Sequence, residues 1–351
     1  MKDRPSVIIR SKDEANRLRL TLASLARQTE PAEVVVVNDG SSDHTDAVIE
    51  EARSHLDLVH VTNASAQGRS RASNIGARRA SGEILIFLDG DTLAAPDLVQ
   101  SHLEVHRAGT GRIVRGSTYH LRCTRFFDDP ATGTARAGEE ARVARMGPGE
   151  IARSVVTVER VRNEFDAIDN RAQPGIYPGA GPRRIFELEM GALHAREVPD
   201  ILWVAASGAN QSVPRDAFLA CGGFHPDISI NEHRELALRL FKEGLSMWPC
   251  TGRSYHLTHR TGWRDPLQDK DWEDVFFELH PIPDVALLSV FWDSINEQTS
   301  LPPAARIHSL PELAAAAQRC RGAVGREMIR QRHMELSLAA PAHAPFPGPR
   351  A

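Results

Sequence analysis

Cysteine and long apolar runs are scarce in this sequence, and positive charge is not in excess. Its 351 residues include four cysteines, which form no CxxC pair, so the sequence predicts neither a zinc ribbon nor a disulfide framework and fits a reducing cytosol. The formal net charge of -4 excludes the broad basic surface that nucleic-acid binding requires. The apolar run Val7 to Ile9 is too short for a signal peptide or a bilayer span. We therefore expect a cytoplasmic protein with no transmembrane segment and no nucleic-acid partner.

Buried-strand patterns fill the first ninety residues instead. Four short apolar runs alternate with helical periodicity, which favours an α/β fold with a doubly wound, mostly parallel sheet flanked by helices. The runs are Val7 to Ile9, Val34 to Val37, Leu58 to Val61 and Glu83 to Leu88. Polar clusters at 10–14, 38–43 and 89–92 follow three of them, and in such sheets ligands lie beyond the carboxyl ends of the strands. These clusters predict a ligand site at that edge.

The remainder of the chain is less regular. We expect a helix near Val158 to Ile168, a strand at Ile201 to Ala205, a helix at Glu232 to Glu243 and one long helix at Pro311 to Leu338. A Pro/Ala tail at 339–351 lacks the composition of a core and is expected to be disordered.

Asp89-Gly90-Asp91 directly follows the fourth apolar run. Two carboxylates one residue apart on a tight glycine turn can hold a hard cation, and that cation can bridge two phosphates. A diphosphate leaving group needs its charge neutralised as the bond to it breaks. A bare DxD triplet also occurs by chance, so its position at the strand end carries the interpretation.

Four ordered segments together make the N-terminal half resemble family 2 glycosyltransferases with the GT-A fold. They are Val7 to Glu14, Val34 to Asp46, Gln67 to Ala77 and Ser81 to Asp91. The resemblance implies a nucleotide-diphospho-sugar transferase that binds its donor on this half and uses Mn²⁺ or Mg²⁺.

The resemblance also implies donor contacts. Asp39 would bind the uracil or an equivalent base, which favours a UDP-linked sugar. Arg10, Asp13 and Glu14 would line the nucleoside pocket, beside Asp89 and Gly90. An Asn-Asp-Gly turn is the alternative interpretation of Asp39.

Arg71 and Asn74 lie three residues apart on one face of a predicted helix, where they could contact the donor. A solvated helix face explains them almost as well.

The second half carries weaker matches. Family members commonly have Glu-Asp at the start of a helix, and here the corresponding residues are Glu232 and His233. Either side chain could deprotonate the acceptor. Glu232 is the preferred base, and a capping acid at the helix N-terminus is its alternative interpretation.

The segment around Pro249-Cys250 is similar to polypeptide N-acetylgalactosaminyltransferases, in which a following histidine completes the metal shell. His256 is our first choice for that ligand and His259 the second, and imidazole beside carboxylates favours Mn²⁺. Arg260 could neutralise the leaving diphosphate. A base at Glu232 suits inversion, whereas the resemblance around His256 is to retaining enzymes, so both outcomes stay open.

We therefore predict a donor-binding half at 1–116, an acceptor-facing half at 117–265 and a C-terminal helical extension at 266–338. The predicted activity is metal-dependent sugar transfer to a soluble peptide, sugar or small molecule. The alternatives are a non-catalytic sugar-nucleotide or carbohydrate-binding protein, which His233 favours, and a nucleotidyltransferase. The loop after the first strand lacks the glycines that nucleotidyltransferases carry there.

Overall fold

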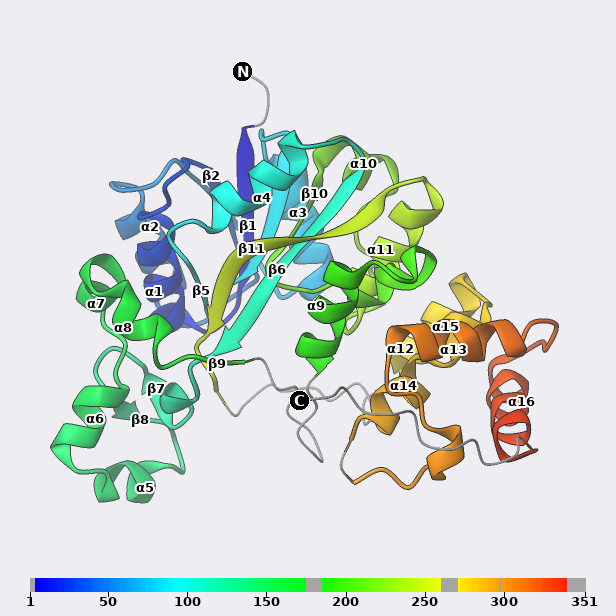
Figure 1. Ribbon diagram of the computed structural model, residues 1–351. Helices are drawn as coiled ribbons and strands as arrows, with labels where there is room; N and C mark the ends of the chain where they lie inside the picture. The colour runs from blue at the N-terminus through cyan, green and yellow to red at the C-terminus, as the bar shows by residue number, and fades with distance from the viewer. Residues whose placement is uncertain (1–3, 175–184, 260–270, 297, 340–351) are drawn as a thin grey trace.

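A nine-stranded sheet forms the centre of the protein in the computed structural model, which describes residues 4–174, 185–259, 271–296 and 298–339 (Figure 1). The strand order is β3-β2-β1-β4-β10-β6-β11-β5, with β9 beside β6. The strands are β1 (Pro5–Ser11), β2 (Glu33–Asn38), β3 (Leu58–Thr62), β4 (Ile84–Asp89), β5 (Thr92–Ala94), β6 (Arg112–His120), β9 (Gln173–Pro174), β10 (Gln211–Pro214) and β11 (Ser246–His256). β1 to β4 are parallel, as are β6 and β11, while β10 is antiparallel to both β4 and β6. The predicted α/β, mostly parallel sheet is confirmed.

The four apolar runs of the N-terminal half form β1 to β4, and helices cover both faces of the sheet. Val7 and Ile9 pack on one face, with α1 (Ala15–Leu25), α2 (Thr45–Ala52) and α4 (Leu98–Arg107), whereas Ile8 packs on the other. That second face carries α3 (Arg69–Arg79), α9 (Ile185–Ala195), α10 (Arg215–Ala220) and α11 (Glu232–Lys242). Because successive side chains of a strand point to opposite faces of the sheet, each strand contributes to an apolar core on both faces.

An insertion follows β6 and lies beside the carboxyl edge of the sheet (Figure 1). It contains a 3₁₀ turn η1 (Arg122–Thr124), a two-stranded ribbon of β7 (Phe127–Asp129) and β8 (Thr134–Ala135), and four short helices. The helices are α5 (Glu140–Arg145), α6 (Pro148–Ser154), α7 (Val158–Asn163) and α8 (Phe165–Asp169). A cluster that joins Leu20 of α1 to Val161 and Phe165 attaches the insertion to the main sheet.

The C-terminal helices share the core of the second face. They are α12 (Asp271–Leu279), α13 (Pro283–Ala286), α14 (Leu288–Ser294), α15 (Leu310–Arg319) and α16 (Arg326–Ala339), with a 3₁₀ turn η3 (Pro303–Ala305). Trp272 and Phe291 belong to the same apolar cluster as Trp203. Among the described residues, no helix combines the length and apolarity needed to cross a membrane.

Three element predictions need correction. The predicted strand at Ile201 to Ala205 is the 3₁₀ helix η2 (Pro199–Ala205), because a short, fully buried apolar run does not distinguish strand from helix by periodicity. The predicted long C-terminal helix is two helices, since Gly322 and Gly325 adopt positive φ between them. The predicted helix near 158–168 is divided into α7 and α8 at Glu164.

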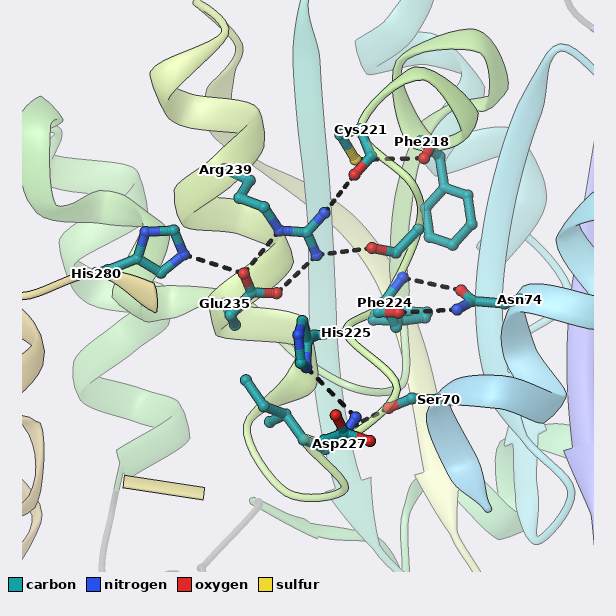
Figure 2. Close-up of polar contacts among 12 residues, drawn as sticks. Ser70, Asn74, Phe218, Cys221, Phe224, His225, Asp227, Glu235, Arg239 and His280 are labelled. Carbon is teal, nitrogen blue, oxygen red and sulfur yellow. Dashed lines mark hydrogen bonds and ion pairs between the residues drawn. The ribbon is translucent and has the colours of Figure 1, made fainter. Parts of the chain in front are cut away.

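A buried carboxylate connects α11 to its surroundings (Figure 2). Glu235 accepts from the Arg239 guanidinium at 2.6 and 2.7 Å, and its Oε1 lies 3.0 Å from Nε2 of His280 in the C-terminal region. Arg239 also donates to the carbonyl oxygens of Cys221 and Gly223. This cluster joins α11, the loop after α10 and the C-terminal helices.

Candidate active site

A cavity of about 660 Å³ opens at the carboxyl edge of β1, β4, β6 and β11. Its lining includes most residues that the sequence predicts for the site, and these come from segments far apart in the chain. They are Arg10, Asp13, Glu14, Asp39, Asp89, Gly90, Asp91, Glu232, His233, His256 and His259. Residues that the sequence predicts as ligand contacts in both halves of the chain therefore line the same cavity.

Asp89 ends β4 beside Arg10 of β1, because parallel pairing aligns these two residues. Nη2 of Arg10 lies 2.9 Å from Oδ1 of Asp89, and both side chains of this ion pair are partly buried. A Cβ at Gly90 would lie 2.3 Å from Oε1 of Glu14, so a larger residue here would displace the Glu14 side chain. Burial and the charges of Asp91 and Asp89 raise the pKa of Glu14 well above its usual value.

Asp91 faces two histidines rather than Asp89. Its Oδ2 lies 3.2 Å from Nε2 of His256 and 2.9 Å from Nε2 of His259, and the ligand atoms of the three residues all lie within 4.8 Å of one another. Burial alone would raise the pKa of Asp91, but the two imidazoles hold it well below its usual value. Both candidate histidines therefore meet the same carboxylate. One carboxylate oxygen and two imidazole nitrogens form a donor set suited to a divalent transition metal.

Strand pairing explains this cluster. β11 pairs antiparallel with β5, which places His256 opposite Thr92, next to Asp91. His256 also faces His120 at the end of β6, with 3.3 Å between their Nδ1 atoms. Burial and the neighbouring His256 lower the pKa of His120 to about 3, so this ring is neutral. His120 lines the cavity, and the sequence analysis did not identify it.

Asp39 orders the loop that precedes α3. Its Oδ1 accepts from the side chain of Asn63 and from the backbone N–H of Gln67, each at 2.8 Å, and its Oδ2 accepts from the N–H of Gly68 at 2.9 Å. A carboxylate offers about four lone-pair positions, so these three bonds leave acceptor capacity for a ligand. Asp13 is used in a similar way, because its Oδ1 accepts from the N–H of Ser42 at 2.7 Å.

Glu232 begins α11, lines the cavity and is almost fully buried. Burial alone would raise its pKa, but His233 and the charges of Arg10 and Arg69 lower the pKa of Glu232 to about 2. The side chain is therefore an anion at any physiological pH. Asn231, which precedes it, adopts the left-handed conformation at φ 65° and directs the start of the helix into the cavity.

The predicted residues Arg71 and Asn74 do not line this cavity. Arg71 is about half exposed and pairs with Asp227 at 3.3 Å. Asn74 is buried and exchanges two hydrogen bonds of 2.8 Å with the backbone of Phe224 (Figure 2). Helical spacing correctly put both residues on one face, but that face packs against the loop after α10. Arg260 lies outside the described residues.

Several cavity residues were not singled out from the sequence, although Lys12 lies in the polar cluster at 10–14 and Arg69 in the segment Gln67 to Ala77. They are Lys12, Arg17, Arg69, Arg136, Phe186 and His120. Arg17 could have been noticed as a cation inside the apolar stripe of α1, where it is 5% exposed. It donates to the carbonyl oxygens of Phe127 and Asp128 and so fixes the insertion beside the cavity.

Sequence comparisons place this architecture among known proteins. Residues 6–154 match the profile of Glycosyl transferase family 2. The chain is 30% identical over 253 residues to validoxylamine A glucosyltransferase of Streptomyces hygroscopicus subsp. jinggangensis, covering 69% of this chain and 52% of that protein. It is 36% identical over 113 residues to the uncharacterized glycosyltransferase YfnE of Bacillus subtilis, covering 32% and 29%. The chain thus spans about half the length of the first relative and less of the second.

Among solved structures, residues 1–349 of Staphylococcus aureus TarS superpose with a TM-score of 0.51 at 13% identity, over 95% of this chain and 88% of that chain. At this identity the superposition supports the fold, which is of the GT-A type.

Proposed function

We propose that the protein, whose residues 6–154 match the profile of Glycosyl transferase family 2, is a metal-dependent glycosyltransferase that uses a UDP-linked sugar. The observation that carries this proposal is the meeting of Asp91, His256 and His259 in a cavity that also contains Asp39 and Glu232. The groups that we propose as donor contacts, cation ligands and base would therefore share one cavity. The acceptor we propose is a soluble peptide, sugar or small molecule.

Asp91, His256 and His259 would hold the cation, and their mixed oxygen and nitrogen donor set favours Mn²⁺. The ion, when bound, would supply charge neutralisation at the leaving diphosphate. Asp89 is paired with Arg10 and does not belong to the group that Asp91, His256 and His259 form, so we assign it to the donor's sugar-nucleotide moiety and leave it out of the proposed metal ligands.

Asp39 would accept a hydrogen bond from the imide N–H of uracil through its remaining lone pair. A buried carboxylate in this role discriminates against a base that offers no donor there. Glu232 would accept the acceptor's proton. Its low pKa makes it always ionised but only weakly basic, so we expect positioning to contribute much of its effect.

The test is donor hydrolysis and Mn²⁺ binding by Asp91→Asn. We expect the wild type to release UDP from a UDP-sugar only with a divalent cation, and Asp91→Asn to lose this release together with the Mn²⁺-dependent thermal shift. Asp97→Asn is the matched control, because Asp97 is exposed and lies outside the cavity. The first relative is named as a glucosyltransferase, so UDP-glucose and GDP-glucose begin the donor panel.

Two outcomes would contradict the proposal. Full donor turnover by Asp91→Asn would refute the metal assignment. Donor binding by the wild type without release of nucleoside diphosphate from any donor would favour a non-catalytic sugar-nucleotide-binding protein, the alternative that His233 suggests.

A further inference from the structure

A buried charge network lies behind the acceptor side of the cavity. Glu189 of α9 is fully buried between two guanidinium groups, with Oε2 at 2.6 Å from Nη1 of Arg115 and Oε1 at 2.5 Å from Nη2 of Arg234. Arg115 and Arg234 also donate to the carbonyl oxygens of Ala205 and Val204. Removing one member of such a network would leave an uncompensated buried charge, so the network holds Arg234 in a single position.

Arg234 extends this network to His233. Its Nη1 lies 2.6 Å from Nε2 of His233 and 2.9 Å from Oδ1 of Asn231. A guanidinium can only donate, so Nε2 of His233 must be an unprotonated acceptor. The ring is consequently neutral in this arrangement, and its proton resides on Nδ1.

Nδ1 of His233 is buried and makes no hydrogen bond to any described residue. It lies 3.7 Å from Oε2 of Glu232, and a Cβ on Gly208 would lie 3.2 Å from it. The absence of a side chain at Gly208 therefore leaves room beside the donor atom. The 3.7 Å separation is longer than a hydrogen bond, and a shift of roughly 0.5–1 Å in either side chain would bring Nδ1–H within hydrogen-bond distance of Glu232.

We propose that His233 is a positioning residue: a neutral hydrogen-bond donor that directs the Glu232 carboxylate, with its tautomer set by Arg234 and Glu189. The proposal rests on the function proposed above, in which Glu232 is the base. It excludes His233 as the proton acceptor, although His233 occupies the place where relatives carry a second acid. The nearby charges agree, because burial and the charge of Arg234 lower the pKa of His233 and outweigh Glu232 and Glu189.

The first test reads the tautomer directly in the wild-type protein. A ¹⁵N-histidine spectrum compared with that of His233→Asn identifies the resonance pair of residue 233 among the fifteen histidines. We expect a neutral ring with the proton on Nδ1 at pH 7. A ring protonated on Nε2, or an imidazolium, would overturn the inference whether or not the protein turns over a donor.

The second test uses two amide variants of similar polarity. In His233→Asn the amide nitrogen replaces Nδ1, so we expect a kcat close to that of the wild type. In His233→Gln the amide occupies the position of Nε2 and the donor toward Glu232 is lost, so kcat should fall about 10- to 100-fold with little change in the donor KM. Equal loss in both variants, with unchanged unfolding curves, would refute the positioning role.

These outcomes separate the inference from the proposed function. An inactive wild type with the expected tautomer would contradict the transferase proposal alone. An active wild type whose acidic pH limb follows the titration of His233, and disappears in His233→Asn, would make the imidazole the base and overturn the inference.

Discussion

Replacing Asn74 by alanine distinguishes a structural role from the donor contact that the sequence suggests. The side chain forms two buried hydrogen bonds with the backbone N–H and C=O of Phe224, each 2.8 Å long (Figure 2). Each backbone group left without a partner costs about 1–3 kcal/mol. Because water can partly replace the lost amide, we expect Asn74→Ala to lower the free energy of unfolding by roughly 2–4 kcal/mol.

The assay is guanidinium unfolding combined with donor KM measurement. Arg71→Ala is the matched control, since Arg71 lies one turn earlier on α3 and its ion pair with Asp227 is largely exposed. A surface pair of this kind contributes about 0–1 kcal/mol. We expect neither variant to change the donor KM. A stable Asn74→Ala protein with a greatly raised donor KM would refute the structural interpretation and support the original prediction.

Two further predictions concern α11. Glu235→Gln should lower the free energy of unfolding by about 2–3 kcal/mol, which is less than the loss of a wholly buried ion pair because Arg239 is partly exposed. The control is Glu243→Gln, at an exposed position, and equal unfolding curves for the two variants would contradict this prediction. His233, Arg10 and Arg69 lower the pKa of Glu232 below its ordinary value of 4.5, so its stabilisation is complete above about pH 4.5 and is lost as the pH falls below that value. Glu232→Gln should therefore flatten the dependence of unfolding free energy on pH in that window, and an unchanged slope would refute the assignment.

The cavity residues that we propose to bind the donor could be located from the sequence because they directly follow strand ends. Each of β1, β2 and β4 is a short apolar run, and the polar residues after it must reach the same edge of a parallel sheet. Arg10 and Asp89 are even aligned in register by the pairing of β1 with β4. In this half each strand is visible as a short apolar run, so periodicity was sufficient to predict the strands and the sheet edge at which they end.

The buried network around Glu189 was less predictable because its partners are distant in sequence. Glu189 has no recognisable motif, and the available signal was only an acid within the mostly apolar stretch Ile185 to Leu193. The strand predicted at 201–205 is instead η2, which supplies the carbonyl oxygens that accept from Arg115 and Arg234. This buried network depends on the tertiary arrangement of β6, α9, α11 and η2, whereas periodicity reports on only one element at a time.

The candidate metal site was partly predictable. The sequence suggested its residues, but their grouping depends on the tertiary structure. The sequence suggested Asp89 and Asp91 with one histidine, whereas the structure pairs Asp89 with Arg10 and brings both His256 and His259 to Asp91. β11 determines this outcome, because it runs parallel to β6 and antiparallel to β5 and changes register between Pro249 and Arg253. A shift of one residue would turn His256 to the opposite face of the sheet. The grouping of Asp91, His256 and His259 is therefore a consequence of strand register, to which the irregularity in β11 contributes.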